Sequence, residues 1–127
     1  MADLTVEEAR ALFDRRRAAW LAADLDGYLA LFADDLEIAM PGRADPVRGI
    51  GPYRQLVTQS FEWARPASFE FHYLAVTGDV VLAEWTISVE RRDTGASAAW
   101  RGMSVCAIRD GQIAWWREYW GPGTIDR

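Results

Sequence analysis

The most informative stretch of this sequence is residues 110–120, which read DGQIAWWREYW. Asp110-Gly111 is a strong signal for a two-residue hairpin turn, because that turn needs a positive φ at both positions. The residues that follow alternate with the period of two that is typical of a β-strand. The alternate residues of this strand form two rows, and either row can face inward: Ala114, Trp116, Glu118 and Trp120, or Ile113, Trp115, Arg117 and Tyr119. Periodicity alone does not choose between them, but Glu118 shares its face with two tryptophans either way.

Three more long strands are predicted before this one, at about 67–76, 80–91 and 98–109, and the last strand covers 112–120. Gly78-Asp79 and Asp93-Thr94-Gly95 supply the turns between the earlier strands. In the strand at 80–91 one row is wholly apolar, and we expect that row to face inward: Val81, Ala83, Trp85, Ile87 and Val89.

The first half of the chain has helical spacing instead. Thr5 and Glu8 form a capping box, and a helix is predicted from there to about Ala23. A second, short helix starts after Asp24 and is expected to close at Asp34-Asp35, before a short strand at 36–40. Residues 41–46 contain two prolines and a glycine and predict a loop, and a third helix runs from Gly51-Pro52 to near Trp63. The order α-α-β-α-β-β-β-β predicts an α+β fold, with an antiparallel sheet and the helices gathered on one face.

Length and composition bound the class of protein. With 127 residues, half of them hydrophobic and 26% charged, we expect a single domain over residues 1–127. The N-terminus is acidic where a signal peptide is basic, and no apolar run is long enough to span a membrane, so we predict a soluble, cytoplasmic protein. Cys106 is the single cysteine, which excludes a disulfide framework and a cysteine-based zinc site.

The charged residues exclude further classes of reaction and partner. All 14 basic residues are arginines, so the absence of lysine excludes Schiff-base chemistry and lysine-held pyridoxal phosphate. Arg15-Arg16-Arg17 is interpreted as a solvated helix face opposite the apolar residues, and the net charge of −5 argues against nucleic acid as a partner. One histidine and scattered carboxylates show no metal-ligand spacing, and Gly49-Ile50-Gly51 is not a dinucleotide loop, so no metal and no cofactor are expected.

Two stretches carry a resemblance to a known family: residues 24–35, DLDGYLALFADD, and residues 110–120. Together with the order of elements, they resemble the nuclear transport factor 2-like superfamily in its SnoaL-like branch, over Glu7 to Gly121. The resemblance implies a cone-shaped, curved antiparallel sheet wrapped around the three N-terminal helices, open at one end and often dimerising through its outer face. The superfamily holds ketosteroid isomerase, polyketide cyclases, limonene epoxide hydrolase and noncatalytic binding domains, so it implies little about chemistry.

Limonene epoxide hydrolase gives the nearest match to the last strand. Its catalytic aspartate lies in a Trp-Arg-Asp-Tyr-Phe-Asp run, and the corresponding residue here is Glu118, which places Trp116 and Trp120 inside. That enzyme's arginine and second aspartate correspond to Trp85 and Ile87, and its water-holding tyrosine and asparagine fall near Glu37 and Ala39, so its full triad is absent.

Ketosteroid isomerase offers a shorter match. Asp45-Pro46-Val47 resembles the setting of that enzyme's base, but the oxyanion-hole tyrosine of its first helix has no counterpart near Phe13 or Arg17. The candidate catalytic residues are therefore Glu118, with His72 or Asp45 as assistants.

Glu118 is expected to lose hydration between indoles without gaining a counter-charge, and so to accept or donate a proton near pH 7. The alternative is a hydrated glutamate or one paired with an arginine. His72 alternates with Phe69, Phe71 and Tyr73 and is interpreted more readily as a structural residue than as an acid or base of the pocket.

A pocket for a small hydrophobic molecule is predicted from the aromatic residues of the inner rows. We expect it to be lined by Trp85, Trp100, Trp116, Trp120, Ile87, Tyr28 and Phe32, although the same tryptophans could simply form the core. Hydrolase, isomerase and cyclase chemistry all remain open, as does an epoxide hydrolase with a rearranged site. The rival hypothesis is a noncatalytic ligand-binding or dimerisation module. On the outer face, Trp115, Tyr119, Arg117 and Met103 predict the interface of a homodimer.

Overall fold

The computed structural model describes residues 3–120 and 125–126. Met1 and Ala2 of the acidic N-terminus, and Gly121 at the end of the stretch that resembles the superfamily, lie outside the described residues. The elements follow in the order α1 (Val6–Leu21), α2 (Leu25–Leu29), β1 (Phe32–Ala39), β2 (Val47–Arg48), α3 (Ile50–Trp63), β3 (Ala64–Thr77), β4 (Val80–Arg91), β5 (Ser97–Arg109), β6 (Gln112–Tyr119) and β7 (Ile125–Asp126).

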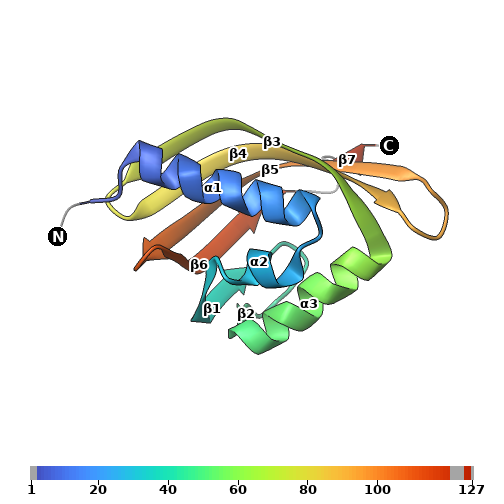
Figure 1. Ribbon diagram of the computed structural model, residues 1–127, viewed down its shortest axis with the longest axis horizontal. Coiled ribbons are helices and arrows are strands. Elements are labelled where there is room, and N and C mark those ends of the chain that lie inside the picture. Colours follow the sequence, from blue (N-terminus) through green and yellow to red (C-terminus); the bar gives the residue numbers. More distant parts are fainter. Residues whose placement is uncertain (1–2, 121–124, 127) are drawn as a thin grey trace.

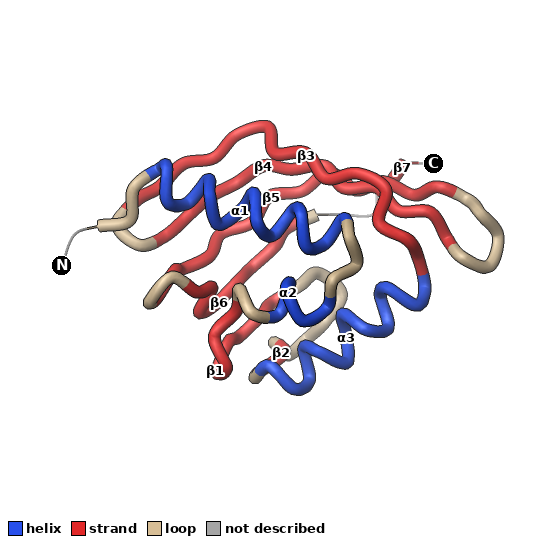
Figure 2. Tube along the Cα trace, in the orientation of Figure 1, coloured by secondary structure: helices blue, strands red, loops and turns tan. Residues whose placement is uncertain are grey.

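The sheet is curved and unclosed, and the three helices lie on its concave side (Figures 1 and 2). Its strand order is β2-β1-β6-β5-β4-β3, with β7 added beside β5. Neighbouring strands are antiparallel except β1 and β6, which run parallel. This arrangement confirms the α+β cone and brings the first strand beside the last long one.

The predicted order of the longer elements is confirmed, with the two-residue strands β2 and β7 in addition, but the first strand begins earlier than expected. β1 starts at Phe32, so Asp34 and Asp35 lie in the strand and do not close α2. The cause is tertiary: Phe32 is in register with Ile113 of β6, and Asp35 accepts a hydrogen bond from Arg109 at 2.5 Å. Strand pairing here outweighs the local preference of the aspartates for a helix end.

Helix α1 shows one correction to the sequence analysis. Its capping box is present, with the Glu8 backbone N–H donating to Thr5 Oγ1 at 3.0 Å. Arg15 and Arg17 are exposed as expected, but Arg16 is buried, with 8% of its surface exposed. Arg16 follows Leu12 by four residues, so it belongs to the stripe that packs against the sheet and not to the solvated face.

The inner rows of the sheet are as predicted at the positions that matter for the site. Trp85 on β4 and Trp116 on β6 are buried, and Glu118 lies on the same side as Trp116. Ile113 is also fully buried, although it belongs to the other row of β6. A register shift opposite Ala107 and Ile108 explains this, because it changes which row of β6 faces inward. Within the described ranges, no helix is long and apolar enough to cross a membrane.

Candidate functional site

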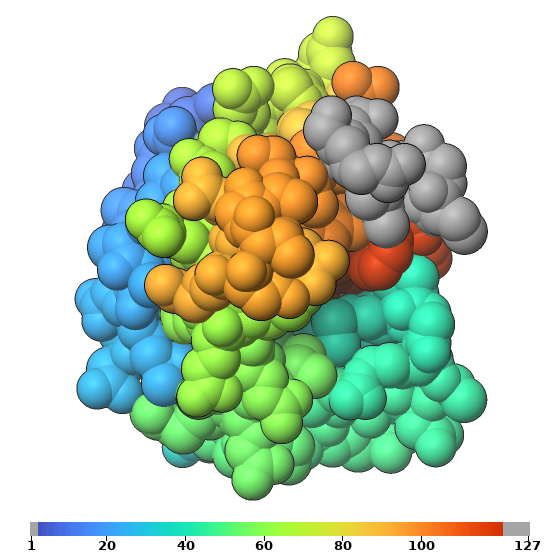
Figure 3. All heavy atoms as spheres, turned by 90° about the vertical axis from the view of Figure 1, so that its right-hand side faces the viewer, coloured from blue at the N-terminus to red at the C-terminus, as the bar shows by residue number. Residues whose placement is uncertain are grey.

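A cavity of about 220 Å³, open to solvent, lies on the concave side of the sheet, between α1, α3 and the strands β4, β5 and β6. Five indoles form most of its wall, and we call these residues the tryptophan cage: Trp20, Trp63, Trp85, Trp100 and Trp120. The remaining lining residues are Ser60, Ile87, Val89 and Glu118. Figure 3 views the molecule from the end where the β4–β5 hairpin lies beside α3. Glu118 is thus the one ionisable side chain among these lining residues.

Glu118 is held by two indoles. Its Oε1 accepts a hydrogen bond from Trp116 Nε1 at 2.9 Å, and its Oε2 accepts one from Trp120 Nε1 at 2.8 Å. From the sequence, the carboxylate was expected to lie between indoles that take away its hydration, but here the indole N–H groups donate hydrogen bonds to it. In the described part of the chain, no arginine lies within 4.0 Å of this carboxylate.

Arg16 lies behind Trp116, inside the cone. Its guanidinium carbon is 4.4 Å from the centre of the Trp116 ring and 5.0 Å from that of Phe69. Nothing in residues 3–120 accepts a hydrogen bond from its Nε or Nη1. Burial acts to lower the pKa of Arg16, but the oxygens of Tyr28, Tyr53 and Glu118 outweigh it and the pKa is raised. The side chain therefore keeps its charge among aromatic faces.

Tyr28 and Phe32, which were predicted to line the pocket, belong to the packed interior instead. Both are almost fully buried, and neither contributes to the tryptophan cage. The hydroxyl of Tyr28 is 3.0 Å from that of Tyr53, and the Tyr53 ring is 5.1 Å from that of Phe32. Burial, followed by the neighbouring Tyr28, raises the pKa of Tyr53 well above its ordinary value. These side chains close the inner end of the cone beside Arg16.

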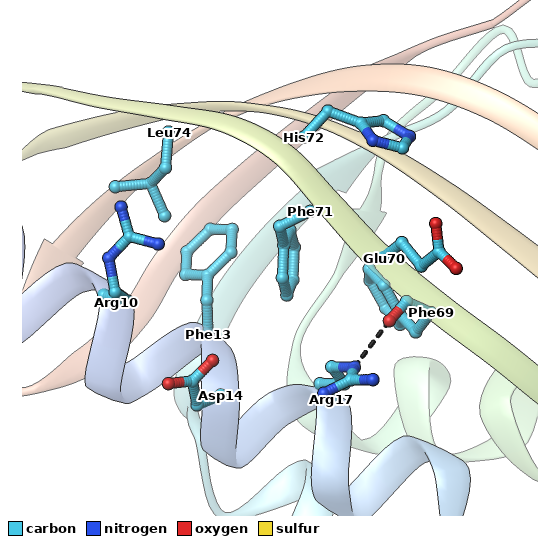
Figure 4. A pocket seen from close by; sticks show the side chains of 9 residues that line it. All are labelled: Arg10, Phe13, Asp14, Arg17, Phe69, Glu70, Phe71, His72 and Leu74. Atoms are coloured by element: carbon cyan, nitrogen blue, oxygen red, sulfur yellow. Dashed lines mark hydrogen bonds between the residues drawn. The ribbon is translucent and has the colours of Figure 1, made fainter.

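His72 lies on the opposite face of the sheet from Glu118. It is exposed, and its Nε2 is 2.7 Å from Thr86 Oγ1, in the outward row of β4. Figure 4 shows its ring on the far side of β3 from Phe13 and Phe71, at the rim of a groove of about 350 Å³ between α1 and β3. Asp45 is exposed in the loop between β1 and β2. The structure does not bring these two residues together with Glu118.

The other positions that were compared with limonene epoxide hydrolase do not form that enzyme's site around Glu118. Trp85 and Ile87 line the tryptophan cage and cannot ionise. Glu37 is exposed on β1 and lies 3.6 Å from Arg48, while Ala39 and Glu118 both line an open surface pocket of about 610 Å³. Only the carboxylate of that enzyme's site has a counterpart facing the cage.

Sequence reasoning missed several residues that shape the site. Trp20 was not among the residues predicted to line the pocket, and Trp63 only marked the end of the third helix, yet both line the cage. Arg16 carried a usable signal, because a charged residue at the spacing of an apolar stripe is a candidate for burial. The bond from Trp85 Nε1 to Ser104 Oγ, at 3.1 Å, joins neighbouring strands and has no signature in the sequence.

With the fold and site in view, the family is established: the SnoaL-like domain matches residues 9–116, and the chain belongs to this family within the nuclear transport factor 2-like superfamily. A putative isomerase from Bacillus subtilis is 22% identical, with a TM-score of 0.82 over 93% of this chain and 89% of that one. A Mycobacterium tuberculosis epoxide hydrolase similar to limonene epoxide hydrolase is 22% identical, with a TM-score of 0.79 over 93% and 86% of the two chains.

A third solved structure is that of a Mycobacterium tuberculosis protein in complex with estradiol-17β-hemisuccinate. It is 19% identical, with a TM-score of 0.81 over 94% of this chain and 98% of that one. At such identities these likenesses establish the fold, and the chemistry must be argued from this chain's own residues.

Proposed function

We propose that the protein binds a small hydrophobic molecule in the tryptophan cage and that Glu118 acts on it as a general base. The observation that carries the proposal is the composition of the cavity wall: five indoles and a single ionisable group, the carboxylate of Glu118. Apolar walls with one precisely held polar group are the usual design of a small-molecule site.

The volume of the cage indicates the size of the group that it can hold. A cavity of about 220 Å³ is smaller than the ~300 Å³ at which pockets for drug-sized ligands begin. It is larger than the ~150 Å³ apolar cavity that holds benzene. A substituted single ring of roughly ten non-hydrogen atoms fits this range. A larger ligand would extend out of the cage, which is open to solvent and shares Glu118 and Trp120 with a neighbouring open pocket of about 610 Å³.

The setting of Glu118 suits a base. Each carboxylate oxygen accepts one indole N–H and keeps a further lone pair for a substrate proton. The indoles also fix the carboxylate in place before the substrate arrives, which is what proton transfer requires. Isomerase, cyclase and hydrolase reactions all use such a step, and the chemistry of the bound ligand would decide among them.

A noncatalytic binding module is the second candidate, and the same two hydrogen bonds favour it. Because Glu118 holds Trp120, which lines the cage, and Trp116 beside it, its role can be to orient aromatic walls. Both candidates require an open cage and differ only in whether turnover depends on the carboxylate.

The test is a thermal-shift screen of wild type and Glu118→Gln with monocyclic terpenoids, substituted benzenes and small epoxides, followed by turnover assays on the hits. A ligand at about a hundred times its Kd adds roughly 2.7 kcal/mol, which a domain of this size reports as several degrees. Glu90→Gln, at an exposed position of β4, is the matched control.

Three outcomes separate the candidates. Binding by both proteins with turnover only in wild type supports the base. Binding without turnover in wild type supports the binding module. No shift with any compound would contradict an open hydrophobic site and with it both candidates.

We also propose that the protein forms a homodimer through the outer face of the sheet. Met103 and Tyr119 are cross-strand neighbours there and are 46% and 59% exposed, and Arg117 stacks over Trp115 at 4.7 Å. Leu82 and Tyr73 extend this exposed apolar surface across β4 and β3. Sedimentation velocity should give a dimer for wild type and a monomer for Tyr119→Glu, with Glu62→Gln on α3 unchanged. A monomeric wild type at micromolar concentration would contradict the proposal.

A further inference from the structure

A second pocket lies directly beside the tryptophan cage, and we call it the side pocket. It has a volume of about 610 Å³ and is open to solvent. Residues 39–41 form one side of it, and residues 117–120, at the end of β6, form the other. Glu118 and Trp120 line the cage as well. The carboxylate that we propose as the base therefore lies where the two cavities meet.

The side pocket forms where two paired strands part. β1 and β6 run parallel, and the last described pair in their register is Ala39 with Arg117. Pro41 cannot continue the ladder because proline has no backbone N–H. A turn follows, in which the Arg43 N–H donates to the Met40 carbonyl oxygen at 3.4 Å. Among the described residues, β6 beyond Arg117 pairs with β5 alone, and the space that β1 leaves beside it is the side pocket.

Most of the wall of the side pocket is apolar. Aliphatic or aromatic groups come from Ala39, Met40, Pro41, Tyr119 and Trp120. A methionine at such a position is flexible and adapts to an irregular aliphatic partner. The charged members are Glu118, at the border with the cage, and Arg117, which is exposed and has its guanidinium carbon 4.7 Å from the centre of the Trp115 ring. An aliphatic group therefore suits the inner part of this pocket.

Continuity with the cage distinguishes the side pocket from two other pockets of the described chain. The groove between α1 and β3, beside His72, shares no lining residue with the cage. The same holds for a pocket of about 570 Å³ between the start of α1 and Asp110. A ligand whose ring fills the cage and that continues past the carboxylate of Glu118 therefore meets the side pocket next.

We propose that the two cavities bind two parts of one ligand: a ring in the tryptophan cage and an aliphatic chain in the side pocket. The carbon that joins ring and chain then lies beside Glu118, and a hydroxyl group on it donates a hydrogen bond to the carboxylate. This inference rests on the proposed function of the cage. It names the class of ligand, a cyclic group with an aliphatic chain and a proton donor at their junction.

The experiment uses a series of alcohols that share one ring. Benzyl alcohol has no chain, whereas α-propylbenzyl alcohol and α-hexylbenzyl alcohol carry chains on the carbon that bears the hydroxyl. A matched isomer of the propyl compound is the phenylbutanol whose hydroxyl is at the far end of the chain. It has the same atoms and tests where the proton donor must lie. The Kd of each compound is measured for wild type by titration.

Affinity should rise with the length of the chain. A fully buried methylene raises affinity by up to about fourfold, so α-propylbenzyl alcohol should bind about tenfold or more tightly than benzyl alcohol. The isomer with the distant hydroxyl should bind about tenfold more weakly than α-propylbenzyl alcohol, because it cannot place its ring in the cage and its hydroxyl at Glu118 together. In Glu118→Gln the preference between these two isomers should shrink.

Met40 reports directly on the side pocket. It lines this pocket and lies outside the proposed dimer interface, to which Arg117 and Tyr119 belong. In protein labelled with carbon-13 at the methionine methyl groups, the Met40 signal is assigned by its loss in Met40→Leu. This signal should move when α-propylbenzyl alcohol binds and much less with benzyl alcohol. Met103, on the convex side of β5, is the internal reference and should move little with either compound.

Three variants separate the side pocket from the cage. Met40→Asp places a charge in the path of the chain and should bind benzyl alcohol as wild type does but lose most of the gain from the propyl group. Met40→Leu keeps an apolar side chain and should retain the gain. Val6→Asp makes the same kind of change at an exposed position of α1 and should behave as wild type.

The outcomes distinguish this inference from the proposed function. Equal affinities along the series, an unmoved Met40 signal, or no binding of any of these alcohols would overturn the inference, whatever other compounds bind in the cage. A chain-dependent affinity with a moving Met40 signal supports it. If that result comes without turnover of any ligand, the inference stands and the role of Glu118 as a base fails alone.

Discussion

At the scale of single residues, Trp116 connects the two charged side chains on the concave side of the sheet, Glu118 and Arg16. The carboxylate of Glu118 and the guanidinium of Arg16 are not in direct contact. The ring of Trp116 contacts both: the guanidinium stacks on its face, and its N–H donates to the carboxylate. An indole is well suited to this position because it offers a π face and an edge N–H at the same time. Replacing Trp116 by Phe would keep the first interaction and lose the second.

Cys106 supplies a prediction about alkaline pH. It is fully buried, and burial raises the pKa of its thiol to about 12. In the unfolded chain a thiol titrates near pH 8.5. Because the folded value is the higher one, this contribution to stability is fully present below the unfolded pKa and is lost as the pH rises toward 12.

We therefore expect the free energy of unfolding to fall above about pH 9, by up to about 1.4 kcal/mol per pH unit from this group. Urea unfolding at pH 8, 9.5 and 10.5 measures it. Cys106→Ala should show a shallower decline, not a flat one, because burial also raises the pKa of Tyr53. Identical slopes in the two proteins would show that the thiol is not the cause.

At the scale of elements, the pairing of β4 with β5 shapes the cage through one close approach. Trp85 and Gly102 are cross-strand partners, and a Cβ at Gly102 would lie 2.8 Å from Trp85 Cη2 and 3.1 Å from the Tyr119 backbone oxygen. The indole of Trp85 therefore lies over a position where no side chain fits. Glycine is required here because a Cβ would not fit, and not because of the backbone conformation, since the φ of Gly102 is not in the left-handed region.

Gly102→Ala should destabilise the protein by about 1–3 kcal/mol, because a buried indole or a strand must shift to admit the methyl group. It should also weaken ligand binding to the cage, since Trp85 forms part of the wall. Urea unfolding and the thermal-shift screen measure the two effects. Gly51→Ala, in the first turn of α3 with nothing within 4 Å of the added carbon, is the control and should be neutral or stabilising.

The elements with strong periodicity could be predicted from the sequence, and the very short ones could not. Helix α1 and the four long strands have enough residues for a pattern, whereas β2 has two residues and depends on pairing with β1. In the site, the inward direction of Glu118 followed from its row and from the family resemblance. The burial of Arg16 was missed because Arg15-Arg16-Arg17 was interpreted as one solvated face, although Arg16 alone of the three has the spacing of the apolar stripe of α1.

At the scale of the whole molecule, the two proposed surfaces lie on opposite faces of one sheet. The tryptophan cage occupies the concave side, and the exposed patch around Met103 and Tyr119 lies on the convex side. Because alternate residues of β5 and β6 serve the two faces, variants of one surface leave the side chains of the other in place. The monomeric Tyr119→Glu variant should therefore retain a cage that binds the ligands found for wild type.

The parallel pairing of β1 with β6 has a consequence for how the protein is made. The Gln112 side chain donates to the Phe32 carbonyl oxygen from 80 residues further along the chain. A ribosome needs roughly 4–16 s to add that many residues. For this interval Leu36 and Ile38, which end fully buried on β1, have no β6 to pair with and lie within reach of chaperones and of other nascent chains. The yield of folded protein should therefore depend on the speed of translation between these two strands.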